Sequence, residues 1–247
     1  MKVRVSIINY SNTIPFVYGL LHNCELQNQS EFLYHYPAQG VELLAEDKVD
    51  ICIVPIAAIP QIPNAQIISN FCIGTFKEVK SVLLCSNTPV SEITHITLDY
   101  QSLSSNMLTK ILAQEVWKIS PQYSMGTEGY ETSHDSSAKV IIGDRAMDLA
   151  HTFAYTYDLA LEWNNAFGYP FVFACWIANK PIAKEYISLF ESALQFGVEH
   201  IDDAITWANK PVSFDMQSYL KTNIDYRLTD DKRKSMELFY EKIQLIK

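Results

Sequence analysis

The stretch SIINYSNTIPFVYGL, residues 6–20, decides how the chain begins to fold. With the preceding KVRV it predicts an apolar strand over residues 3–8, which is followed by the polar break NYSNT. Pro15 then opens a second apolar run, which predicts a helix up to His22 because proline fits the first turn of a helix. The break is either a loop with a helix cap or a ligand site made of uncharged hydrogen-bond donors.

The same alternation of strand and helix continues along the chain. Further strands are expected at residues 32–36, 49–55, 81–87, 95–100, 138–144 and 169–179. Helices are expected at residues 40–48, at 104–119 and after Lys180, where apolar residues recur at helical spacing. Strands that are apolar on both faces indicate sheets covered by helices, which is an α/β fold. The polar segment 122–137 predicts surface loops and an irregular strand.

Composition and charge exclude several classes of partner. A chain of 247 residues can bury a sizeable core, as one large domain or two small lobes. The net charge of −9 argues against nucleic acid and against an anionic membrane as partners, so local hydrogen-bond donors would have to hold any small anion.

The sequence also bears on where the protein is found. The N-terminus lacks the apolar segment of a signal peptide, and apolar runs fall short of the ~18–20 residues that span a bilayer, so we expect a cytoplasmic protein. The odd number of cysteines, without a CxxC pair, predicts buried free thiols.

Polar residues follow the predicted strands at several junctions, where α/β proteins bind ligands. One junction holds Asn12, and the segment VPIAA follows the strand that ends near Pro55. Another, LDYQSLSSN, places Ser102, Ser104 and Ser105 at one helix start, and IIGDRA places Asp144 after a strand. Helix capping explains any one of these residues, but the serine cluster exceeds what a single cap requires.

The usual catalytic motifs are missing, since the sequence contains no GxGxxG, P-loop, GxSxG or HExxH pattern. His151, in DLAHTFAY, is interpreted as a packing residue on a helix. No ligand cluster or cofactor motif indicates a metal or an organic cofactor. The residues alone therefore indicate a domain that binds a small polar ligand, and they leave its chemistry open.

Read together, several segments resemble the chorismate dehydratase of the futalosine route to menaquinone. They follow in the family's order, from residue 3 to about residue 245: SIINYSNTIPFVYGL, VDICIVPIAAI, CIGTFKEVKSVLLCSN, LDYQSLSSNMLTKIL, VIIGDRAM and DLALEWNNAFGYPFVFACWIAN. The run PFVFACW favours this enzyme over its closest relative. The resemblance implies a type II periplasmic-binding-protein-like fold, with two α/β lobes around a central cleft. We expect residues 1–86 plus 178–247 in the first lobe and 87–177 in the second.

The resemblance also implies a lyase reaction, the loss of water from chorismate, and roles for particular residues. Asn12 and Ser81 would be catalytic: Asn12 would fix the substrate's conformation, and Ser81 would hold a carboxylate or assist departure of the hydroxyl. Ser104 and Ser105 would bind the ring carboxylate, and Ser102 and Asp144 would belong to the substrate site. The sequence departs from the family in the loop Gly74–Glu78, which is poorer in glycine, and in having a serine pair where threonine-serine is common.

Two alternatives share the expected fold. One is the 1,4-dihydroxy-6-naphthoate synthase of the same pathway, which acts on a cyclic futalosine derivative. The other is a non-catalytic solute-binding or sensor protein that holds a small anion. Turnover of chorismate would distinguish a chorismate dehydratase from both alternatives.

Overall fold

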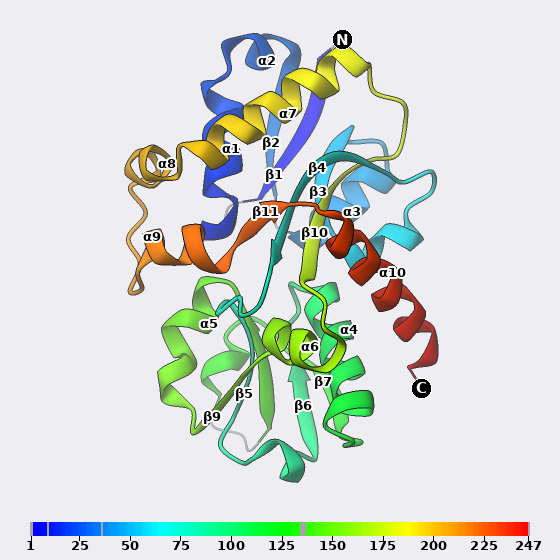
Figure 1. Cartoon of the computed structure of the whole chain (residues 1–247), viewed down its shortest axis with the longest axis vertical. Helices are drawn as coiled ribbons and strands as arrows, with labels where there is room; N and C mark the ends of the chain where they lie inside the picture. The colour runs from blue at the N-terminus through cyan, green and yellow to red at the C-terminus, as the bar shows by residue number, and fades with distance from the viewer. Residues whose placement is uncertain (1, 9, 36, 134–136, 247) are drawn as a thin grey trace. The chain divides into compact units, whose positions relative to one another are not determined.

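The computed structural model describes residues 2–8, 10–35, 37–133 and 137–246. Contacts divide the chain into two compact units (Figure 1). The first comprises Met1–Gly74 and Val172–Thr229, and the second Thr75–Phe171 and Asp230–Lys247. Each unit contains a sheet and helices, so the α/β class is confirmed.

The sheet of the first unit has the strand order β11-β4-β10-β3-β1-β2. Its strands are β1 Val3–Ile8, β2 Ser30–His35, β3 Ile51–Pro55, β4 Gln66–Thr75, β10 Phe171–Ala178 and β11 Asp225–Arg227. β1 pairs in parallel with β2 and β3, whereas β10 runs antiparallel to β3. Every residue of β3 is buried, as expected for a strand inside a helix-covered sheet.

The helices of the first unit include a group that packs on α1 (Figure 1). They are α1 Ile14–His22, α2 Cys24–Gln29, α3 Pro37–Ala45, α7 Lys184–Glu199, α8 Ile201–Ala208 and α9 Met216–Ser218, with shorter helical turns at η1 Ser11–Thr13, η2 Ile56–Gln61 and η7 Tyr219–Asn223. The Phe16 ring of α1 meets the rings of Phe71, Trp176 and Tyr226 edge to face. The apolar run after Pro15 therefore anchors α1 in the core of this unit.

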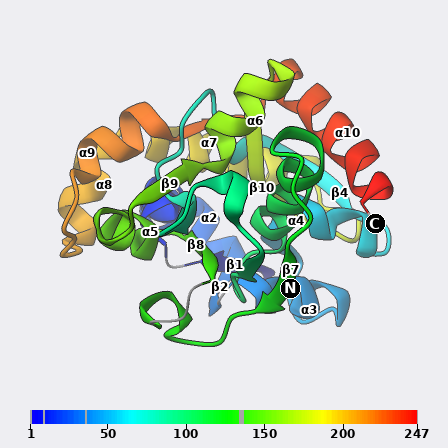
Figure 2. The same cartoon turned by 90° about the horizontal axis from the view of Figure 1, so that it is seen from below.

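The second unit has the strand order β7-β6-β8-β5-β9. Its strands are β5 Val82–Ser86, β6 His95–Leu98, β7 Gln122–Met125, β8 Ala138–Ile142 and β9 Tyr155–Asp158. Its helices are α4 Leu103–Ile111, α5 Asp144–Leu149, α6 Leu159–Phe167 and α10 Asp230–Leu245, with shorter turns at η3 Val90–Glu92, η4 Leu112–Val116, η5 Tyr130–Thr132 and η6 Ala150–Thr152. Helix α10 lies beside α4 in both views (Figures 1 and 2).

The unit boundaries differ from those expected from the sequence. The strand at Val82–Ser86 belongs wholly to the second sheet, and the last helix packs in the second unit rather than on the first. Its Phe239 ring meets Trp163 and Phe171 edge to face, and Trp163 Nε1 donates to Ser235 Oγ at 3.0 Å. The apolar face of this helix was visible in the sequence, but its pattern does not say which core it enters.

Most of the predicted strands and helices are present, and the exceptions have local causes. β4 and β11 were not predicted, because Ser69 and Asn70 interrupt the apolar pattern of β4 and β11 is short. β9 was missed because its residues are exposed or only partly buried. The interpretation of His151 as a packing residue was wrong, since α5 ends at Leu149 and His151 is exposed in the following turn.

The cysteines are largely as expected. Cys52, Cys72, Cys85 and Cys175 are buried and free, whereas Cys24 is exposed at the start of α2. Burial raises the pKa of Cys52 and of Cys85 to about 12, which keeps both thiols protonated and unreactive. Within the described ranges, no helix combines the length and apolar character needed to cross a membrane.

A charge cluster ties together three strands of the first unit. The Asp50 carboxylate, before β3, accepts from Arg4 Nη2 on β1 at 2.7 Å and lies 2.5 Å from Lys180 Nζ, just after β10. Burial acts to raise the pKa of Asp50, but hydrogen bonds from Arg4 and Lys180 outweigh it and lower the pKa to about 2. Asp50 is therefore charged at neutral pH and holds the strand ends in register.

Replacing Asp50 with asparagine is expected to remove roughly 2 kcal/mol of stability at pH 7, given this shift from an ordinary pKa. The unfolded chain binds the proton more readily than the folded chain, so the contribution is full above about pH 4 and is lost as pH falls towards 2. Urea unfolding between pH 7 and pH 3 measures it. Asp50→Asn should lose less stability on acidification than the wild type. An equal fall in the free energy of unfolding for both proteins would contradict the role assigned to the Asp50 charge.

Candidate functional site

One edge of the second sheet gathers most of the residues that the sequence singled out. β6 and β8 run parallel, so both end at this edge, and β5 runs antiparallel to β8 and therefore begins there. Val82 faces Ile142, and Gly143 N donates to the Ser81 carbonyl at 2.7 Å. Ser81, the serine cluster after β6 and Asp144 after β8 are thus placed at the same edge.

The turn after β8 depends on a glycine. Gly143 has φ 66° and ψ −150°, a conformation that side-chain-bearing residues essentially do not adopt. This turn lets the Gly143 N–H reach Ser81 while α5 starts immediately at Asp144. The sequence IIGDRA therefore codes a sharp strand-to-helix turn next to the start of β5.

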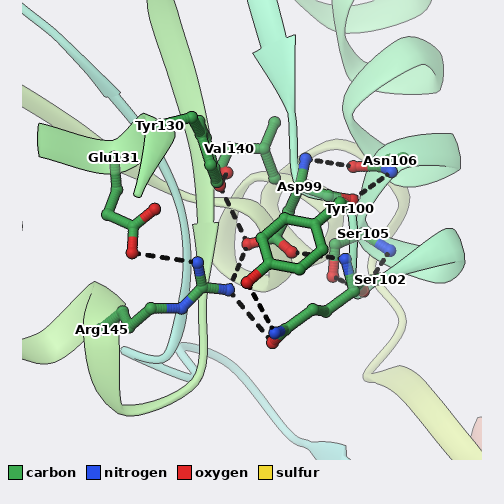
Figure 3. Close-up of polar contacts among 10 residues, drawn as sticks. Asp99, Tyr100, Ser102, Ser105, Asn106, Tyr130, Glu131, Val140 and Arg145 are labelled. Carbon is green, nitrogen blue, oxygen red and sulfur yellow. Dashed lines mark hydrogen bonds and ion pairs between the residues drawn. The ribbon is translucent and has the colours of Figure 1, made fainter. Parts of the chain in front are cut away.

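The serine cluster contains one cap and two further hydroxyls. Ser102 is the N-cap of α4: its Oγ accepts from Ser105 N at 3.3 Å and donates to Ser105 Oγ at 2.7 Å (Figure 3). The capping interpretation thus holds for Ser102, and Ser102 also orients the Ser105 hydroxyl. Ser104 and Ser105 are buried in the first turn of α4, where backbone N–H groups favour an anion.

A buried carboxylate, Asp99, lies directly after β6 and organises this edge (Figure 3). Its Oδ2 accepts from Tyr130 Oη at 2.9 Å and from Arg145 Nη2 at 2.8 Å, and its Oδ1 accepts from Gln101 N at 2.8 Å. Burial raises the pKa of Asp99, and the charge of Arg145 acts against that rise. These donors engage the carboxylate, which makes Asp99 a structural acceptor rather than an exposed base.

The loop that carries Ser102 is fixed from its other side by Asn106. Asp99 N donates to Asn106 Oδ1 at 3.0 Å, and Asn106 Nδ2 donates to the Asp99 carbonyl at 2.8 Å (Figure 3). This pair of hydrogen bonds closes the segment between β6 and α4 into a rigid turn. The backbone between β6 and α4, which carries Ser102, is therefore held in place by the Asn106 side chain.

Arg145 extends the network across the edge. Its Nη1 lies 3.2 Å from Glu131 Oε1, its Nη2 donates to Gln101 Oε1 at 3.3 Å, and its guanidinium lies over the Tyr100 ring. Sequence reasoning missed Asp99, Tyr130, Glu131 and Arg145. The acidic residue directly after a strand in LDY was a local signal for Asp99, but nothing local pairs it with an arginine 46 positions away.

The loop before Ser81 is held by Asp158, the N-cap of α6. Its Oδ2 accepts from Val79 N at 2.9 Å and Lys80 N at 2.7 Å, while its Oδ1 accepts from Ala160 N and Leu161 N, both at 3.1 Å. Burial raises the pKa of Asp158, against the effect of these N–H groups. Asp158 thereby sets the entry into β5 and the position of Ser81, which is itself buried.

Asn12 lies in the first unit, in η1 at the carboxyl end of β1. Thr13 provides the local turn contacts: its Oγ1 donates to the Ile8 carbonyl at 2.6 Å and accepts from Tyr10 N at 3.3 Å. Within the part of the chain that the structure describes, the half-buried Asn12 side chain makes no hydrogen bond. The capping explanation therefore does not account for Asn12, whose amide remains available to a ligand.

A family profile and several solved structures resemble this chain. The profile, described as menaquinone biosynthesis, matches residues 3–244. A protein from Archaeoglobus fulgidus, solved in a structural genomics programme, superposes with a TM-score of 0.75 at 12% identity, covering 99% of this chain and 97% of that chain.

Two further solved structures carry a stated fold or ligand. A Candida albicans protein with the generic periplasmic binding protein fold gives a TM-score of 0.63 at 12% identity, covering 99% of this chain and 94% of its own. The alkanesulfonate-binding protein SsuA from Xanthomonas axonopodis pv. citri, bound to MOPS, gives 0.67 at 13% identity, covering 100% and 94%. At these identities the similarity shows the fold alone, and the two α/β units have the fold of periplasmic binding proteins.

Proposed function

The chain belongs to the menaquinone biosynthesis family, and on that premise we propose that it is a chorismate dehydratase, a lyase of the futalosine route. The reaction converts chorismate to 3-[(1-carboxyvinyl)oxy]benzoate and water. The observation that carries the proposal is a set of uncharged hydroxyl donors at one edge of the second sheet, in a chain that matches the family over residues 3–244. These donors are Ser81, Ser102, Ser104 and Ser105.

The chemistry requires little from the protein beyond positioning. Loss of a ring proton and a hydroxyl group makes the ring aromatic, so the driving force already resides in the substrate. In the proposed mechanism, the substrate's own enolpyruvyl carboxylate takes the proton. Holding the reacting groups in near-attack geometry can supply about 7–11 kcal/mol of the barrier reduction.

The described side chains support a mechanism in which the protein positions the substrate and the substrate supplies the base. The Asp99 carboxylate accepts hydrogen bonds from Tyr130 and Arg145, so we do not assign Asp99 as the base and give that role to the substrate's own carboxylate. Neutral donors can bind a dianion by hydrogen bonding despite the net charge of −9. We assign the ring carboxylate to Ser104, Ser105 and the start of α4, with Ser102 and Asp144 beside them, and assign catalytic roles to Asn12 and Ser81.

The resemblance to SsuA keeps a non-catalytic binding protein as a second candidate, and one experiment separates it from the enzyme. The purified chain is heated with chorismate, with the cyclic futalosine derivative, and without ligand, while matched incubations are analysed by chromatography and mass spectrometry. A dehydratase raises its melting temperature with chorismate and consumes it. A melting shift without turnover indicates a binding protein, and turnover of the futalosine derivative alone indicates the sister synthase.

Replacing Ser81 with alanine is expected to lower the rate with chorismate by about 100-fold, because a hydroxyl that assists the transition state is lost. Ser86, the buried serine at the other end of β5, is the matched control. Its replacement by alanine removes a hydroxyl from the same strand, away from the site edge, and should leave the rate within about twofold. Equal rates for Ser81→Ala and the wild type would demote Ser81 to a structural hydroxyl.

A further inference from the structure

The residue before Ser81 has a backbone conformation that lysine rarely adopts. Lys80 has φ 61°, in the left-handed region, where glycine is favoured because a Cβ crowds the neighbouring backbone. Its exposed side chain makes a 3.5 Å ion pair with Glu78. An exposed ion pair contributes little, so another contact must offset the strain of the Lys80 backbone.

That contact comes from Asp158, on which two successive backbone N–H groups converge. Val79 N and Lys80 N donate to Asp158 Oδ2 at 2.9 Å and 2.7 Å. Successive N–H groups next to a left-handed residue form a concave nest for an anion, and hydrogen bonds to a charged acceptor are stronger than neutral ones. The nest requires the positive φ of Lys80, so the carboxylate stabilises that conformation.

The other oxygen of Asp158 is fixed independently of this turn. Its Oδ1 accepts from Ala160 N and Leu161 N at the start of α6, both at 3.1 Å. The backbone of Asp158 ends β9 and faces Leu83 of β5. The carboxylate is therefore anchored on β9 and α6, while Oδ2 reaches the turn. The two oxygens have separate tasks, which a substitution can separate.

Ser81 follows this turn directly and is held on its other side. Gly143 N donates to the Ser81 carbonyl at 2.7 Å, and the Ser81 side chain is buried. A change of φ at Lys80 would turn the Ser81 backbone away from this position. We propose that Asp158 is a positioning residue for Ser81, which acts by holding Lys80 in the left-handed conformation. This role rests on the proposed function, because it takes Ser81 as the catalytic hydroxyl.

Asp158→Asn separates the two tasks of the carboxylate. Asparagine caps a helix as well as aspartate does, but an amide nitrogen in place of Oδ2 is a donor and cannot accept from the turn. We expect kcat with chorismate to fall by about 10- to 100-fold, with KM within about twofold of the wild type. Adding Lys80→Gly should restore the rate by about fivefold or more, because glycine adopts the left-handed conformation without strain. An unchanged kcat in Asp158→Asn would overturn the proposal.

Two substitutions added to Asp158→Asn are the matched controls. Lys118 is a second lysine of this unit with a positive φ, 56°, so Lys118→Gly relieves the same kind of strain elsewhere and should restore nothing. Lys80→Ala removes the lysine side chain but keeps the Cβ, and should also restore nothing. Circular dichroism checks folding. If Asp158→Asn does not fold, Asp158→Ser, which has a shorter side chain that can still cap α6, replaces it. Restoration by either control, or none by Lys80→Gly, would overturn the proposal.

Urea unfolding of the same variants distinguishes this role of Asp158 from the proposed function. Asp158→Asn should cost less stability in the Lys80→Gly background than in the wild type, because both substitutions act on one turn. The effects of Asp158→Asn and Lys118→Gly should instead add. A wild-type chain that leaves chorismate unchanged would overturn the proposed function, and the unfolding measurements would still test the turn. Additive effects of Asp158→Asn and Lys80→Gly would overturn the role of Asp158 at Lys80.

Discussion

Asn12→Ala is expected to slow the conversion of chorismate by at least about 100-fold while leaving the fold intact. The proposed reaction depends on the protein to position the substrate, so loss of a positioning contact raises the activation barrier. The Asn12 side chain makes no hydrogen bond within the described ranges, and Thr13 provides the local turn contacts. The free energy of unfolding should therefore change by less than about 0.5 kcal/mol. Steady-state rates and urea unfolding of the same preparation measure the two quantities.

Asn23→Ala provides the matched control in the same unit. Asn23 is the N-cap of α2 and accepts from Leu26 N at 3.0 Å, so its loss should cost about 1 kcal/mol of stability. Its rate with chorismate should remain that of the wild type. The two variants are thus expected to show opposite patterns, and a normal rate in Asn12→Ala would remove the catalytic assignment.

Gly197→Ala is expected to destabilise the first unit by about 3 kcal/mol, although alanine is ordinarily the better helix former. Helices α1 and α7 approach so closely that a Cβ on Gly197 would lie 1.8 Å from the Pro15 carbonyl oxygen. A Cβ on Gly19 would likewise lie 1.9 Å from the Ala193 carbonyl oxygen. Because these contacts are backbone atoms, the helices must separate to relieve the clash.

The consequence should reach the proposed site, because Pro15 follows Asn12 by one helical turn. Gly197→Ala should therefore lower both the melting temperature and the rate with chorismate. Ser192→Ala, at an exposed position of the same helix, adds no clash and should change stability by less than about 0.5 kcal/mol. A Gly197→Ala variant as stable as the wild type would show that the two helices adjust without cost.

The parts of the fold that the sequence predicts are those set by local pattern. The strand–break–helix unit around Asn12 and the turn at Gly143 follow from apolar periodicity, proline and glycine, and both are present. β9 and β11 were not predictable in the same way, because short and partly exposed strands are stabilised mainly by their partners. The assignment of α10 to a unit depends likewise on Trp163 and Phe171, distant in sequence.

In the candidate site, too, the residues that local sequence pattern predicts differ from those that only tertiary contacts bring together. Serines before a helix are visible in a sequence, and Ser102 and Ser105 meet as expected from one helix start. The hydrogen-bond network joins residues from separate segments, Asp99, Tyr130 and Arg145, so no local sequence motif predicts it. Sequence resemblance supplied the proposed roles of Asn12 and Ser81, and these roles remain predictions until variants are assayed.

The most direct test of the proposed function is incubation of the purified chain with chorismate and no added metal, followed by chromatography and mass spectrometry against an enzyme-free control. The proposal predicts a single product lighter than chorismate by one water, formed faster than spontaneous breakdown and absent with Asn12→Ala. Chorismate that persists unchanged beside folded wild-type protein would contradict the assignment of this chain as a chorismate dehydratase.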